Sequence, residues 1–201
     1  MCDNPRMRAG AVLLLFTALL PAQSTRPKDL AAGKLLVASR DLGDPNFAQT
    51  VVLLVHYDED GVVGVVVNRR TKVPISRALE DLKGAKGRSD LIYSGGPVGP
   101  SDVLALVRSP EKMEKAEHVF GDVYLVNSVE VLEKAMAANS ADTLHVYVGY
   151  AGWTPRQLAA EVELGAWFIF SGDAGAVFAA NPQSLWTRFI EMTEDRVARA
   201  F

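Results

Sequence analysis

Side chains suited to catalysis or metal binding are thinly spread along this sequence. Its three histidines are His56, His118 and His145. No two of them stand three or four residues apart, the spacing that lets one helix offer two imidazoles to a metal ion, and no His-Glu-x-x-His pattern occurs. We therefore predict no metal site. His56 and His145 fall in apolar, strand-like runs, where a structural imidazole is the commoner interpretation.

A serine hydrolase can be assembled on paper from Ser94 or Ser101, a histidine and an aspartate. The nucleophilic serine of many hydrolases stands in a Gly-x-Ser-x-Gly turn, and the sequence contains no such turn. Triples of these residue types also arise by chance in a chain of this size. We predict no catalytic residue, although a hydrolase that uses Asp44 or a histidine in a cleft stays open as an alternative.

Two loops rich in turn-forming residues are candidate binding sites. Gly95, Gly96 and Pro97 begin a Gly/Pro segment that could offer successive backbone N–H groups to an anion, but the segment lacks the Gly-Lys-Ser/Thr ending of a phosphate loop. Asp44 and Asn46 belong to a second such run. A tight turn is the simpler interpretation of each, because these residue types are ordinary turn formers.

A third candidate loop surrounds Gly152 and Trp153. An aromatic residue at the entrance of a helix can anchor a partner, or it can pack its own helix against the sheet. The sequence Thr154-Pro155-Arg156-Gln157 combines an N-cap residue, a proline at the first helical position and the spacing of a capping box. We favour the packing interpretation of Trp153 and expect the helix to end near Gly165.

The elements that must position these residues alternate between strands and helices. Two β-branched runs, 50–56 and 62–68, flank an Asp-Gly turn and predict a central hairpin that is buried on both faces. Shorter strands are expected at 34–38, 91–93, 103–107, 122–126, 144–148 and 166–170, and helices after Ser76, Ser128, Thr154 and Asn181. Hairpins mixed with strand-helix-strand units predict an α+β (mixed α/β) domain whose mainly antiparallel or mixed sheet is flanked by several helices.

The first residues have the three-part order of an export signal. Arg6 and Arg8 precede an apolar run over 9–20, and small residues follow at Ala22 and Ser24. We expect a signal peptide over residues 1–24, cleaved near Ala22 to Ser24, then a linker over 25–32 and one domain over 33–201. The expected location is periplasmic or secreted, and a cytoplasmic protein with a buried or amphipathic N-terminal helix is the alternative.

Composition narrows the classes of function further. The only cysteine is Cys2, within the expected signal, so no disulfide or cysteine-ligated metal is predicted for the mature chain. A formal net charge of −3 and scattered basic residues argue against nucleic acid as a partner. We expect no cofactor and no stable membrane span once the signal is removed, and a protein or small ligand of unknown identity as the partner.

Four blocks of sequence together resemble the AlgH/YqgE family. They are 33–38 continuing to 42–47, 50–68, 95–98, and 149–167, and in order they cover nearly the whole chain beyond the signal. The family is largely uncharacterised and often labelled as transcriptional regulators. The resemblance implies a compact mixed α/β domain with no catalytic residue and no cofactor. Family members usually begin almost at the first strand, so the expected signal departs from their pattern.

Two classes of function follow from these observations. The first is a non-enzymatic binding or regulatory domain that acts outside the cytoplasm through the candidate loops, and the second is a hydrolase. The regulator label of the family is a third interpretation, which requires the protein to remain in the cytoplasm.

Overall fold

The computed structural model describes residues 23–199, and side chains as far as Glu194. Eleven strands form one continuous sheet system in the order β1-β11-β2-β3-β4-β10-β7-β9-β8, with β6 pairing β10 and β5 pairing β6. All pairs are antiparallel except β6 with β10. The strands are β1 (Gln23–Ser24), β2 (Lys34–Ala38), β3 (Val51–Tyr57), β4 (Val62–Val66), β5 (Arg70–Pro74), β6 (Leu91–Ser94), β7 (Val98–Arg108), β8 (Glu117–Phe120), β9 (Val123–Val126), β10 (Leu144–Trp153) and β11 (Trp167–Ser171).

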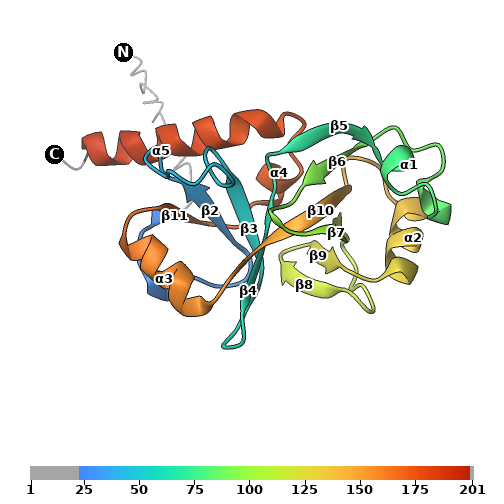
Figure 1. Ribbon diagram of the computed structural model, residues 1–201, viewed down its shortest axis with the longest axis horizontal. Helices are drawn as coiled ribbons and strands as arrows, with labels where there is room; N and C mark the ends of the chain where they lie inside the picture. The colour runs from blue at the N-terminus through green and yellow to red at the C-terminus, as the bar shows by residue number, and fades with distance from the viewer. Residues whose placement is uncertain (1–22, 200–201) are drawn as a thin grey trace, which may run out of the picture.

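Helices cover both ends of this sheet, so the predicted α+β class is confirmed. In Figure 1 the long α5 lies across one side of the β2–β3 half, α3 lies on the other side of that half, and α2 covers the far half near β7. The α-helices are α1 (Ile75–Ala78), α2 (Val129–Ala138), α3 (Pro155–Glu163), α4 (Ala174–Val177) and α5 (Leu185–Arg199), and the 3-10 turns are η1 (Pro27–Asp29), η2 (Lys83–Ala85) and η3 (Pro182–Ser184).

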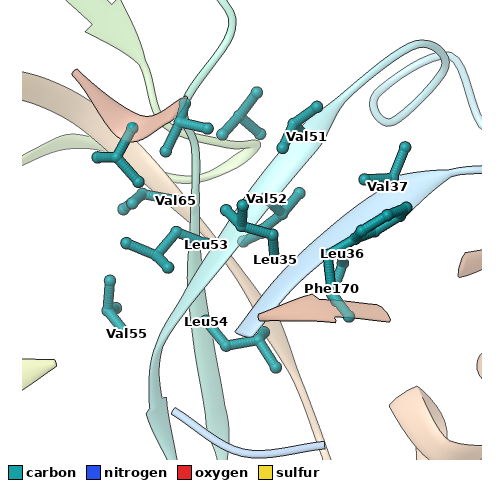
Figure 2. Packing of buried hydrophobic residues seen from close by; sticks show 14 of the residues in the cluster. Leu35, Leu36, Val37, Val51, Val52, Leu53, Leu54, Val55, Val65 and Phe170 are labelled. Carbon is teal, nitrogen blue, oxygen red and sulfur yellow. The ribbon is translucent and has the colours of Figure 1, made fainter. Parts of the chain in front are cut away.

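The central hairpin is buried as the sequence predicts. Every residue from Val51 to Val55 in β3 is buried, and β4 is nearly so. Figure 2 shows their branched side chains packed with those of Leu35, Leu36 and Phe170 from the neighbouring strands β2 and β11. Continuous runs of β-branched residues suit a strand that has no solvent face, because both sides of the pleat must be apolar.

The sheet curls so that strands distant along its path meet. A second apolar core, between α2 and the outer faces of β7, β9 and β10, holds the far half together. Phe120 of β8 lies against Gly33, just before β2, and Glu117 of β8 hydrogen-bonds His56 of β3. The curl leaves a concave side between the two halves, with β10 as the strand they share.

The segment before β2 differs from the expected linker. Residues 25–32 contain η1. Leu30, which is 7% exposed, packs in the apolar core formed by β2, β3, β4 and β11. Gln23 and Ser24 pair with β11, and the Ser24 hydroxyl donates a hydrogen bond to the Asp29 carboxylate. A polar composition suggested a tether, but a single buried leucine and a short strand pairing attach this segment to the domain. Of the signal expected over 1–24, residues 1–22 lie outside the described residues, and Gln23 and Ser24 form β1.

Candidate functional site

Strand β10 controls where the predicted site residues lie. It continues through Trp153 with a register shift between Val148 and Tyr150, so the expected loop at Gly149–Gly152 is instead a bulged strand. The prediction was wrong because glycines that accommodate a bulge resemble, in sequence, glycines that end a strand. Alternation along β10 then sends Trp153 to one face and Tyr150 and Gly152 to the other.

Trp153 is a packing residue on the helix-covered face. Its side chain is 6% exposed, its ring stacks on Phe47 with centroids 5.5 Å apart, and it meets Trp167 edge-on at 6.1 Å. Its indole Nε1 donates to Glu161 of α3 over 3.2 Å. The structure therefore places Trp153 between its own helix and the sheet, with little surface left for a partner.

Asp44 and Asn46 shape the turn that carries Phe47 to this tryptophan. The Asp44 carboxylate accepts a hydrogen bond from the Asn46 backbone N–H over 2.8 Å, and Arg69 donates to the Asn46 carbonyl over 2.6 Å. Both side chains are exposed. The arrangement is a local Asx turn with an arginine clamp.

Gly95 and Gly96 follow β6 and lie in close backbone contact with β10, along a line that we call the seam. Gly95 donates its N–H to the Val148 carbonyl over 2.9 Å, so that group is not available to an anion. A Cβ on Gly95 would overlap the Gly149 carbonyl, and one on Gly96 would overlap the Tyr150 backbone. These glycines are required by close backbone approach, whereas Pro97 is exposed beside them.

The seven predicted site residues do not form one cluster. Asp44 and Asn46 lie in the turn that carries Phe47, whose ring stacks on Trp153. Gly95 and Gly96 lie against the backbone of β10. Gly152 is exposed on the face of β10 opposite Trp153. What they share is proximity to β10, whose two faces separate them.

The concave side of the sheet carries a cavity of about 590 Å3 that the sequence did not reveal. Its apolar lining includes Val63 of β4, Leu104 of β7, Leu125 of β9 and Val129 at the start of α2. Its polar groups come from strands far apart in the chain and include His56, Asp102, Glu117 and Tyr150. A concave, mainly apolar pocket with a few polar groups is typical of small-molecule sites.

His56 at the rim of this cavity is held between two carboxylates. Nε2 lies 2.7 Å from Asp58 Oδ2, and Nδ1 lies 3.1 Å from Glu117 Oε1. The hydrogen bond to Glu117, followed by that to Asp58, raises the pKa of His56. The pKa of Asp58 is lowered, first by the hydrogen bond from the backbone N–H of Gly61 and then by the hydrogen bond with His56. The two contacts of His56 thus join β3 to β8, and both its nitrogens can donate when the ring is protonated.

This geometry argues against a serine triad in the cavity. Ser101 lines the same cavity as His56, but a general base needs a ring nitrogen free to accept the serine proton, and both nitrogens of His56 face carboxylates. Among residues 23–199 no group of three or more His, Cys, Asp or Glu side chains could hold a metal ion. No helix in the same range has the length and apolar character of a membrane span.

Sequence reasoning missed Glu117 and Asp102 because no local pattern marks them. Glu117 stands 61 residues after His56, and only the curl of the sheet brings them together. The alternation of side chains between the two faces of a strand could have identified part of the cavity floor. Val63 pairs with Gly152 across β4 and β10, so a correct strand assignment for β10 would have put Val63 and Gly152 on one face.

Comparison with known proteins agrees with this architecture. A protein of Corynebacterium diphtheriae has a crystal structure similar to this chain, with a TM-score of 0.67 over 82% of this chain and 87% of that one, at 22% identity. The AlgH protein of Pseudomonas aeruginosa, known from a solution structure, has a TM-score of 0.65 and 30% identity, over 79% and 86% of the two chains.

Sequence relatives point the same way. Two proteins named UPF0301 are similar along most of their length. The one from Streptomyces coelicolor is 37% identical over 77% of this chain and 82% of its own, and the one from Myxococcus xanthus is 36% identical over 79% and 88%. The profile of a family described as AlgH-like matches residues 35–198, which include every strand from β3 to β11 and all the cavity residues named above. This chain belongs to the AlgH-like family.

Proposed function

We propose that this protein is a non-enzymatic binding domain that holds a small amphipathic ligand in the concave cavity. The observation that carries the proposal is the cavity itself, since it combines a floor of valine and leucine side chains with a few polar groups at its rim. Two of the exposed large apolar residues flank it. Val129, which lines the cavity, is 59% exposed. Val98, which is 40% exposed, pairs across β7 and β10 with Tyr150 of the lining.

The charges at the rim favour a ligand that donates hydrogen bonds or carries a positive charge. Asp102 lies over Gly99 beside the Tyr150 ring and forms no ion pair within the described part of the chain. Glu117 and Asp58 both face the one imidazole of His56. Carboxylates therefore outnumber cations around an apolar floor, which suits an amine attached to an apolar body.

Ligand-observed NMR with cationic, neutral and anionic aromatic fragments tests this proposal. We expect fragments such as phenethylamine to bind and benzoate-like fragments not to bind in this cavity. Ser101→Trp fills the cavity from an exposed position and should abolish binding, and Asp102→Asn should weaken the cationic fragments most. Ser184→Trp, at the exposed last residue of η3, is the matched control. Equal binding by the Ser101→Trp and Ser184→Trp variants would remove the cavity as the site.

We also propose that the domain acts outside the cytoplasm. The support is the order of basic, apolar and small residues within 1–24. N-terminal sequencing of the protein from fractionated host cells tests this. Cleavage after Ala22 would leave β1 intact, and cleavage after Ser24 would remove β1 together with the hydrogen bond to Asp29. An intact Met1 in the cytosol would overturn export and favour the regulator label.

A further inference from the structure

The concave cavity has carboxylates on two strands that are not neighbours. Asp102 belongs to β7 and Glu117 to β8, and β9 separates these strands in the sheet (Figure 1). Both residues are exposed. Among the described residues that line the cavity there is no lysine or arginine, and His56 beside Glu117 is the one lining residue that can carry a positive charge. The cavity therefore offers two separate anionic groups to a ligand.

The strand register puts leucine side chains between these two carboxylates. Leu125 of β9 pairs with Glu117 on one side and with Leu106 of β7 on the other. Along β7, Leu104 stands between Leu106 and Asp102, and Leu104 and Leu125 both line the cavity. A ligand that reaches from one carboxylate to the other must therefore lie over an apolar floor.

The same register sets the span between the two ends. Four residues of β7 and two strand spacings separate Asp102 from Glu117, which is roughly 13 Å along the strand and roughly 10 Å across the sheet. The diagonal between the backbones is thus about 16 Å, and two side chains that converge over a concave floor shorten it to about 10–12 Å between carboxylates. An extended chain gains roughly 1.3 Å per bond, so about nine bonds cover this span.

Each end offers surroundings that suit an ammonium group. Asp102 and the Tyr150 ring both come within 2.9 Å of the position that a Cβ on Gly99 would take, so a cation beside Asp102 also lies near an aromatic ring. At the other end Glu117 and Asp58 both face His56. Two carboxylates exceed the single charge that one imidazole can carry, so this end stays negative when His56 is protonated.

We infer that the concave cavity binds a linear diamine of about eight carbons, with one ammonium group at Asp102, the other at Glu117 and the methylene chain over Leu104 and Leu125. The inference rests on the proposed function, since it names the class of amine that the same cavity takes. A charged nitrogen in the middle of the chain would weaken binding, because it would lose water over the leucine side chains without gaining a partner.

Calorimetric titration with four amines tests the inference. We expect 1,8-diaminooctane to bind at least about threefold more tightly than octylamine, which lacks the second ion pair, and than 1,4-diaminobutane, which is too short to span the floor. Spermidine has as many bonds between its terminal nitrogens as 1,8-diaminooctane, but its third charge falls over the floor, so it should also bind more weakly. General attraction to an acidic surface would instead make spermidine the tightest ligand.

A pair of variants locates the second ammonium group. Glu117→Gln should lower the affinity for 1,8-diaminooctane to about that for octylamine, and should leave octylamine nearly unchanged because Asp102 can still hold it. Glu114→Gln removes the same charge from an exposed residue outside the cavity lining and is the matched control. Saturating 1,8-diaminooctane should also shift the NMR signals of the His56 ring, since Nδ1 lies 3.1 Å from Glu117 Oε1.

Three results would overturn the inference. They are octylamine or spermidine binding as tightly as 1,8-diaminooctane, equal binding of the diamine by the Glu117→Gln and Glu114→Gln variants, and His56 signals that stay fixed at saturation. If phenethylamine still binds in the cavity in any of these cases, the proposed function stands without the diamine. Failure of every amine to bind there removes both.

Discussion

Trp153 connects the turn at Phe47 with α3 and β11, which follow it in the chain. Its ring stacks on Phe47, meets Trp167 edge-on and donates to Glu161, which also accepts from Trp167 Nε1 over 2.8 Å. One glutamate thus satisfies both indole N–H groups at the edge of the core. Aromatic pairs of this kind contribute beyond their buried area, so the position is energetically important for the fold.

Replacement of Trp153 by alanine should lower the free energy of unfolding by about 3–5 kcal/mol, because it removes a buried aromatic ring and leaves a cavity. Urea unfolding monitored by circular dichroism measures the loss. Val98→Ala is a control at a 40% exposed position and should change stability by less than about 0.5 kcal/mol. An unaltered midpoint for Trp153→Ala would contradict the packing role.

Gly95 illustrates a residue requirement set by backbone approach. Gly95→Ala should destabilise the protein by about 2 kcal/mol or more, since a methyl group would collide with the Gly149 carbonyl of β10 and force the strands apart. Gly43→Ala is the matched control, because a Cβ there meets no atom within 4 Å. Thermal unfolding of the two variants compares them, and similar melting temperatures would show that the seam can open at little cost.

At the scale of elements, the sequence predicted most strands and the start of helix α3. The central hairpin follows from β-branched runs that no helix favours. The Thr154-Pro155 start is confirmed, since Thr154 Oγ1 accepts from the Gln157 N–H over 3.1 Å. The short strands β1, β5 and β8 were missed. β5 and β8 carry charged residues and few branched apolar ones, so their extended form depends on neighbours rather than on local preference.

The cap of α3 can be tested directly. Thr154→Ala removes the acceptor for the Gln157 N–H and should cost about 1 kcal/mol in unfolding free energy. Thr154→Ser keeps the hydroxyl oxygen and should recover most of that loss. Equal stability of the alanine and serine variants in urea would indicate that Pro155 and the packing of Leu158 alone set the start of the helix.

At the scale of the whole molecule, the curl of the sheet brings together the walls of the concave cavity, and no local pattern encodes it. Strand β10 pairs with three strands and thereby joins the two halves. His56 with Glu117, and Phe120 with Gly33, connect strands that are distant along the sheet path. Sequence reasoning could identify the elements but not these long-range contacts, so the candidate loops it selected stabilise the fold while the concave cavity went unpredicted.

The contacts of His56 should make the free energy of unfolding fall as pH rises above about 6.5. Its pKa is raised in the folded state by Glu117 and Asp58, so the stabilisation is complete below the unfolded-state pKa of about 6.5 and is lost as pH rises through the folded-state value. The side chain is 40% exposed, so solvent and salt reduce the size of the effect. His56→Gln should flatten this part of the pH profile of urea midpoints, and an unchanged slope would contradict it.

His145 should produce the opposite dependence on the acid side. Its folded-state pKa of about 4 lies below the unfolded value, so the unfolded chain gains a proton that the folded protein resists as pH falls from about 6.5 to about 4. With the group 7% exposed, the loss over that interval should reach about 3 kcal/mol. Urea unfolding of the unaltered protein and of His145→Phe across this interval measures it, because phenylalanine keeps the stacking on Tyr93 and Phe178 but cannot titrate.

Carboxylates with lowered pKa values, such as Asp58, act in the same direction at lower pH and are common to both proteins. The difference between the two profiles therefore isolates His145, and profiles that run parallel from pH 6.5 to 4 would show that the imidazole can take up a proton in the folded protein without loss of stability.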